Sequence, residues 1–175
     1  MTPDAATILP DGALVDSATS DAGRLERRIY LQEGVAPTAA AMDVACNQGF
    51  APFIVRNTKV PSQQAGKFTP DDKAIVRFAD RAQVASTVGA LETGGPSREI
   101  LTPSGTGPVG GATHVWTGFR APGLAGFTCE NWGDTSDRKG AGAGVYNSTV
   151  ASERVFSTIK SCEAANTLMV YCLEM

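Results

Sequence analysis

The sequence predicts an α+β domain with two short helices, several short strands and long loops. Nineteen glycines and ten prolines among 175 residues favour a loop-rich fold over a helical bundle. The strand-like runs are short, and only two segments carry helix-start signals. The run at 168–173 (LMVYCL) is nearly all apolar, so we expect it to be a central, buried strand.

The first 26 residues differ in character from the rest of the chain. They are small, polar and interrupted by proline and glycine, so we expect residues 1–26 to be a linker or an arm packed on a neighbouring chain. No basic segment followed by an apolar core is visible in residues 1–21, so we expect no signal peptide there. If the protein is exported, we expect this chain to be a mature piece of a longer polypeptide. The folded domain is expected over residues 27–175.

The domain is expected to begin with a strand, a helix and a second strand. Residues 27–31 (RRIYL) predict the first strand. Residues 37–49 predict a helix, with a proline near its start, alanines in the middle and a glycine at its end. The apolar residues of this helix recur at helical spacing, and Cys46 belongs to the face that they form. Residues 51–56 (APFIVR) predict the second strand.

The middle of the chain predicts a second helix between two loops. Residues 57–67 are polar and loop-like. The sequence TPDD at 69–72 is typical of a helix start, with Thr69 as N-cap, and the helix is expected to continue through residues 73–81. Residues 83–91 look extended, and the glycine- and proline-rich segment 92–111 predicts a long surface loop.

The last third of the chain predicts strands framed by a glycine-rich loop. Residues 114–119 (HVWTGF) alternate as a strand does, and 128–132 (TCENW) predicts a short strand or turn. Residues 133–147 (GDTSDRKGAGAGVYN) predict a long loop. Residues 153–162 fit either a strand or one helical turn.

The charge and hydropathy of the chain exclude two classes of partner. The net charge is −3 and there is no lysine-rich tail, so the chain lacks the basic excess that nonspecific binding to nucleic acid or to an anionic membrane requires. No apolar run approaches the roughly 20 residues that span a bilayer, so we expect no membrane insertion.

Four cysteines permit three disulfide pairings. No C-x-x-C spacing occurs and the chain has a single histidine, so a zinc site of the usual kind is not expected, and neither is another metal or cofactor. Two disulfides in an oxidising compartment are one interpretation. Four reduced, buried cysteines in a cytosolic protein are the alternative.

The sequence does not predict a catalytic site. The serines lack a G-x-S-x-G context, and His114 reads either as a surface residue or as an isolated ligand. Trp116 and Trp132 fit either a sugar-stacking platform or core aromatics. We therefore expect no enzyme.

The candidate binding residues lie in and beside the predicted glycine-rich loop. They are Asp134, Asp137, Arg138, Lys139 and Tyr146. Mixed charges and an exposed tyrosine in a glycine-rich frame suit an adaptable recognition surface, whereas the alternative is a solvated loop without a ligand.

Four stretches together bring a known family to mind. They are AMDVACNQG at 41–49, AIVRFADRAQV at 74–84, VWTG with TCENW at 115–132, and SC with LMVYCLE at 161–174. In this order they resemble the endostatin-like domain at the C-terminus of certain collagens and related bacterial secreted domains. The resemblance implies a C-type-lectin-like fold, in which two short helices pack on a mixed, mostly antiparallel sheet with long loops. The resemblance spans about residues 27–174.

The resemblance implies a specific disulfide pairing, Cys46 with Cys172 and Cys129 with Cys162. Several family features do not carry over. The histidines of the endostatin zinc site have no counterpart between residues 27 and 46, and the arginines form no cluster comparable to its heparin-binding face. The Glu-Pro-Asn or Gln-Pro-Asp loop of calcium-dependent lectins is also missing.

These observations predict an extracellular or cell-surface recognition module. We expect the terminal head of a longer protein, such as a homotrimeric fibre or adhesin, that binds a glycan or a protein on another surface. The alternative is a structural or assembly domain of an envelope or matrix protein that contacts only its own chains.

Overall fold

The computed structural model describes residues 26–109, 113–133, 135–136, 138–163, 165 and 167–175. The expected arm, except for Glu26, and the candidate binding residues Asp134 and Asp137 lie outside these ranges. The described elements, in chain order, are β1 (Glu26–Val35), α1 (Ala39–Ala45), β2 (Phe50–Pro52), η2 (Pro61–Gln63), β3 (Ala74–Arg77), β4 (Gln83–Ala85), α2 (Val88–Gly94), β5 (His114–Trp116), β6 (Phe119–Ala121), β7 (Leu124–Ala125), α3 (Cys129–Trp132), β8 (Gly140–Val145), η3 (Ala151–Arg154), β9 (Thr158–Ser161) and β10 (Leu168–Glu174).

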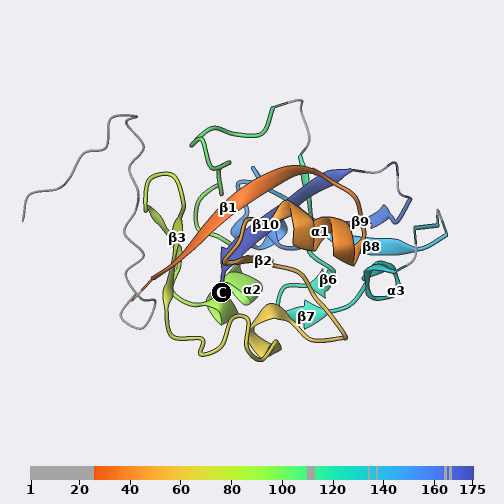
Figure 1. Cartoon of the computed structure of the whole chain (residues 1–175), viewed down its shortest axis with the longest axis horizontal. Coiled ribbons are helices and arrows are strands. Elements are labelled where there is room, and N and C mark those ends of the chain that lie inside the picture. The colour runs from red at the N-terminus through yellow and green to blue at the C-terminus, as the bar shows by residue number, and fades with distance from the viewer. Residues whose placement is uncertain (1–25, 110–112, 134, 137, 164, 166) are drawn as a thin grey trace, which may run out of the picture.

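The main sheet is mixed and mostly antiparallel. Its strand order is β4-β3-β1-β10-β5-β8-β9, and β2 pairs with β10 outside this path. Only the pairs β1–β3 and β10–β5 are parallel. The first and last strands of the described chain therefore lie side by side, as Figure 1 shows in orange and blue. The predicted α+β class with a mixed sheet is confirmed, with three short helices in place of two.

Strand β10 lies at the centre of the sheet and is buried on both faces. Met169 and Tyr171 pack into the larger apolar cluster, with Val55, Phe119 and Leu91, whereas Val170 and Cys172 point into a second cluster. Alternate side chains of a strand point to opposite faces, and both faces of this one are covered. The predicted central, buried strand is thereby confirmed.

Helix α1 covers the second face of the sheet. Thr38 caps it, with its hydroxyl accepting the Ala41 backbone N–H at 3.2 Å. Met42 is fully buried, and Cys46 forms a disulfide with Cys172 of β10. The predicted helix and its core-facing cysteine are confirmed, although the helix is shorter than residues 37–49.

The predicted helix over residues 69–81 is wrong. Residues 74–77 instead form β3, which pairs in parallel with β1 and buries Ile75 and Val76. Asp71 does cap a helix, but one that is distant in sequence. Its carboxylate accepts hydrogen bonds from the N–H groups of Val88 and Gly89, at the start of α2. The first three residues of the extended segment expected over 83–91 form β4, whereas α2 replaces its last four.

The predicted loop over residues 133–147 is also wrong in its second half. The run GAGAGV forms β8, between β5 and β9. Glycine is required there because other backbone segments approach closely. A Cβ on Gly142 would lie 1.8 Å from the Phe119 carbonyl oxygen, and one on Gly144 would lie 2.0 Å from that of Arg154. The alternatives left open for residues 153–162 both occur, because η3 is followed by β9.

Two disulfides are present, Cys46–Cys172 and Cys129–Cys162. This is the pairing that the resemblance implied, and it is consistent with an oxidising compartment. None of the helices in the described part of the chain has the length and apolar character that crossing a bilayer requires.

Candidate functional site

The structure separates the predicted binding residues. Arg138 and Lys139 are exposed just before β8, whereas Tyr146 lies just after it. Seven residues of extended chain place the two ends about 20 Å apart. Tyr146 is also partly buried against the larger apolar cluster. The expectation that these residues share one loop is therefore corrected, because a strand of the sheet separates them.

The two tryptophans belong to the core. Trp116 and Trp132 are 0% and 2% exposed and pack edge to face, with ring centroids 6.1 Å apart. Their indole N–H groups donate to the carbonyl oxygens of Val35 at 3.1 Å and Val55 at 2.8 Å. Buried indoles with satisfied donors stabilise a core and offer no face to a sugar.

His114 begins β5 and is half-buried. Its Nδ1 lies 3.0 Å from the hydroxyl of Thr113. Burial, and then the positive charge of Lys160, lower the pKa of the imidazole below its ordinary value of 6.5. Among the described residues, no group of three or more His, Cys, Asp or Glu side chains could hold a metal ion.

Helix α3 is a left-handed turn. All four residues from Cys129 to Trp132 have φ between 50° and 66°. For non-glycine residues this conformation costs roughly 1–2 kcal/mol per residue, and it persists only where the surroundings enforce it. Sequence reasoning expected a strand or a turn at 128–132, and no local signal in TCENW indicates this handedness.

Three sets of contacts hold the left-handed turn. Thr128 caps it, accepting the Asn131 N–H at 3.1 Å, and the Cys129–Cys162 disulfide ties it to the end of β9. The buried Trp132 anchors its last residue. The exposed Glu130 carboxylate pairs with Lys139 Nζ at 2.7 Å. One of the predicted binding residues, Lys139, is thereby joined to the turn.

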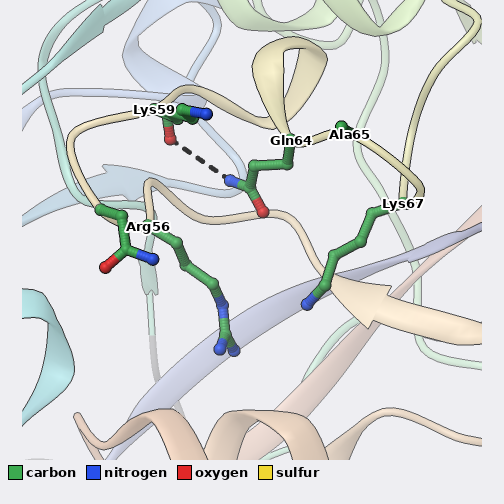
Figure 2. Close-up of a pocket in the computed structure, with 6 residues that line it drawn as sticks. Arg56, Lys59, Gln64, Ala65 and Lys67 are labelled. Carbon is green, nitrogen blue, oxygen red and sulfur yellow. Dashed lines mark hydrogen bonds between the residues drawn. The ribbon is translucent and has the colours of Figure 1, made fainter.

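A basic pocket of about 410 Å³ opens beside this turn. The residues that line the pocket are Arg56, Asn57, Lys59, Gln64, Ala65 and Lys67. They all belong to residues 56–67, which we call the pocket loop. Figure 2 shows that the Lys67 ammonium group points toward the Arg56 guanidinium, and that the side-chain oxygen of Gln64 faces the space between them. The pocket therefore brings together two cations, Arg56 and Lys67, and a hydrogen-bond acceptor, whereas the Lys59 ammonium lies at its edge, away from them.

Gln64 has a fixed orientation in this pocket. Its Nε2 donates to the carbonyl oxygens of Ile54 at 2.7 Å and Lys59 at 3.3 Å. Two acceptors on one side require the amide nitrogen there, so Oε1 must face the pocket. Gln64 thus holds the loop with one end of its amide and presents an acceptor with the other.

The pocket keeps an excess of positive charge. Arg56 is paired with Asp43 of α1. The Asp43 carboxylate accepts hydrogen bonds from both terminal nitrogens of the guanidinium, at 2.6 and 3.1 Å. Burial lowers the pKa of the Lys67 ammonium, the Arg56 charge lowers it further, and Asp43 offsets part of this effect. Among the described residues, the carboxylate of Asp43 thus faces the two cations of Arg56 and Lys67, so a bound anion would find an unbalanced charge.

The basic pocket and the left-handed turn form one continuous surface. Asn57, on the pocket rim, has φ of 48° and pairs reciprocally with Asn131 of the turn. The Asn57 N–H donates to Asn131 Oδ1 at 2.7 Å, and Asn131 Nδ2 donates to Asn57 Oδ1 at 2.8 Å. We call this combined surface, with Lys139, the binding face.

Sequence reasoning missed the pocket because residues 57–67 look like an ordinary polar loop. One signal was available. Residues 56–67 carry three of the fifteen basic residues and no acidic residue, in a chain of net charge −3. The approach of the Arg56 and Lys67 side chains to one hollow is not visible in the sequence, because it depends on how the loop folds back on itself.

Comparison with known proteins identifies no family, since no family model and no curated protein sequence matches this chain significantly.

Proposed function

We propose that this chain is an extracellular recognition module that binds a glycan or a protein on another surface through the binding face. The observation that carries the proposal is the left-handed turn beside the basic pocket. A strained backbone segment that its surroundings enforce is common at functional sites. Here the strained residues border a hollow whose positive charge is not balanced.

The geometry of the binding face suits recognition. The cations and amide groups of the pocket can bind charged and hydroxyl groups without further rearrangement, because the loop and the turn are held in place. The described side chains of the pocket are Arg, Lys, Asn, Gln and Ala, a set suited to hydrogen bonding and charge pairing.

The finer fold assignment is part of the same proposal. We infer a C-type-lectin-like fold of the endostatin type, located outside the cell or at its surface, as the terminal head of a longer and homotrimeric protein. The support is the four sequence stretches, the disulfide pairing that the resemblance implied, and the mixed sheet. Disulfides form and persist mainly in oxidising compartments.

A binding screen tests the proposal. The whole chain, labelled at its N-terminus, is applied to a glycan array, to extracellular-matrix proteins and to intact cells. We expect saturable binding to a surface polymer that weakens in the double variant Lys59→Gln/Lys67→Gln and persists in Lys160→Gln. A chain that binds none of these surfaces would instead favour a structural domain that contacts only its own chains, and sedimentation would then show its assembly state.

A further inference from the structure

The basic pocket contains two kinds of binding group at close range. Lys67 Nζ supplies positive charge and has no anionic partner within hydrogen-bonding distance among the described residues. It also lies close enough to Arg56 for that charge to lower its pKa. Gln64 Oε1 supplies an acceptor whose direction is fixed by the two bonds of Nε2. A ligand that fits both carries an anionic group and, next to it, a hydrogen-bond donor.

We propose that the basic pocket binds an acidic sugar, with the sugar carboxylate against Lys67 and a neighbouring hydroxyl donating to Gln64. This inference rests on the recognition function proposed above and specifies its ligand chemistry. The sugar carboxylate would also lie within the field of Arg56, whereas Asp43 opposes it.

The size and lining of the pocket favour a sugar acid over a simple anion. A volume of about 410 Å³ is far larger than a single sulfate or carboxylate group requires and falls within the range of small-molecule sites. An inorganic oxyanion at neutral pH has few or no protons to donate and would leave Gln64 Oε1 without a partner.

The lining also disfavours an acidic peptide. Ala65 is the one apolar side chain among the six described lining residues, so an aliphatic stem or a neighbouring apolar residue would gain little by burial. A sugar instead presents hydroxyl groups around the whole ring. Asn57 Nδ2, which has no partner among the described residues, is a further donor for such a hydroxyl.

Calorimetric titration of the whole chain tests this inference. The probes are a trimer of galacturonic acid, N-acetylneuraminic acid, the galacturonate trimer with its carboxylates reduced to alcohols, a capped triglutamate peptide and inorganic sulfate. We expect binding of at least one carboxylated sugar, at least tenfold weaker binding of the reduced trimer, and no comparable binding of the peptide or of sulfate.

Matched variants locate the site. Lys67→Gln is expected to weaken binding about tenfold, the effect of losing one charge-assisted hydrogen bond. Lys160→Gln removes the same charge on β9, outside the pocket lining, and is expected to leave the affinity within twofold of wild type. Asp43→Asn removes the opposing charge and is expected to tighten binding about threefold.

The pKa of Lys67 provides a readout that does not depend on affinity. A carboxylate beside the ammonium stabilises its charged form, so NMR titration of the lysine side chain should show a higher Lys67 pKa with the sugar than without it. Equal binding of the reduced trimer, preference for the peptide, absence of binding by both carboxylated sugars, or an unchanged affinity in Lys67→Gln would each overturn the inference.

The two proposals fail in different ways. Binding to a neutral glycan or to a protein in the surface screen, without binding of the carboxylated sugars, would overturn the acidic-sugar inference and leave recognition standing. If the carboxylated sugars bind the pocket but no surface polymer is bound in the screen, the site is a small-molecule site and the recognition proposal fails.

Discussion

The left-handed turn and the pocket loop lie side by side but are held by different means. The turn is strained, and a disulfide, a buried tryptophan and a threonine cap enforce it. The pocket loop has no cysteine and depends on buried polar groups. Within the loop, Gln64 donates to the carbonyl oxygen of Lys59, and from outside it Glu92 accepts from Ser62. Arg27 donates to the carbonyl oxygen of Pro70 just beyond the loop and to that of Glu174 in β10.

The difference indicates what each region must supply. Four consecutive residues with positive φ oppose the ordinary preference of the backbone, so covalent and packing restraints are needed. If the pocket loop binds a ligand as we propose, its lysines must stay available. Neutral Gln64 and the carboxylate of Glu92, which faces Ser62, hold the loop without forming ion pairs with Lys59 or Lys67.

Of the changes made within the two regions, removing the disulfide of the turn should have the largest effect. Cys129→Ala/Cys162→Ala opens a link over 33 residues, which should lower the free energy of unfolding by about 3–4 kcal/mol. Urea unfolding measures this loss, and hydrogen exchange should show the left-handed turn losing protection before the pocket loop does.

The second disulfide is the control for this comparison. Cys46→Ala/Cys172→Ala spans 126 residues and should cost about 5 kcal/mol while acting on α1 and β10. If the turn loses protection equally in both variants at matched global stability, its restraint is not local and the comparison fails.

Breaking the polar hold of the pocket loop should have the next largest effect. Gln64→Ala removes two hydrogen bonds at a cost of about 2 kcal/mol, because the Ile54 carbonyl group loses the Gln64 donor, whereas that of Lys59 keeps the Arg56 N–H. Gln63→Ala, one residue earlier at an exposed position, should change the free energy of unfolding by less than about 0.5 kcal/mol. Equal effects of the two substitutions in urea unfolding would show that Gln64 does not hold the loop.

Relieving the strain of the turn should have a smaller and opposite effect. Glu130→Gly and Glu130→Ala both remove the exposed ion pair with Lys139, but only glycine tolerates φ of 52° without penalty. We expect the glycine variant to be about 1 kcal/mol more stable than the alanine variant in urea unfolding. Equal stabilities would mean that the turn stores no strain at this residue.

The smallest expected effect is a pH dependence at Glu92. This carboxylate is buried and accepts the Ser62 N–H at 2.5 Å and the Ser62 hydroxyl at 2.8 Å. Burial raises its pKa above the ordinary 4.5, whereas the bonds from Ser62 lower it by less. Since the folded-state pKa is raised, the contribution of Glu92 is fully present below pH 4.5 and is lost as pH rises through the folded value.

Glu92→Gln is the matched variant, because its amide can still accept from the Ser62 N–H and donate to the Ser62 hydroxyl. The stability of wild type relative to this variant should fall by up to about 1 kcal/mol between pH 4.5 and 8, measured by urea unfolding. A difference that is constant or rises with pH would contradict the raised pKa.

The errors of the sequence analysis share one physical origin. Residues 69–72 carry a genuine helix-capping carboxylate, Asp71, but the helix it caps begins at Val88. Residues 140–145 look like a flexible loop, yet their glycines are needed where the Phe119 and Arg154 backbones pass close to β8. In both cases the residue types indicate a real local interaction, but the partner in that interaction is a segment that is distant in sequence.

The candidate site was predictable only in small part. Lys139 was singled out from a charged, glycine-rich stretch, and it does adjoin the left-handed turn through Glu130. Tyr146 was separated from it by a strand that depends on pairing with β5 and β9. Residues 57–67 look like an ordinary polar loop, because sequence spacing does not show which of their side chains converge.

The amino-acid sequence by itself determined the features that depend on near neighbours. These are the α+β class, the capped helix with Cys46 on its buried side, and the doubly buried strand β10, all readable from apolar periodicity and capping chemistry. Tertiary structure alone decided the strand at β3, the left-handed turn and the basic pocket. Each of these is enforced by segments far away in sequence: β1 for β3, Cys162 and Asn57 for the turn, and Asp43 and Ile54 for the pocket.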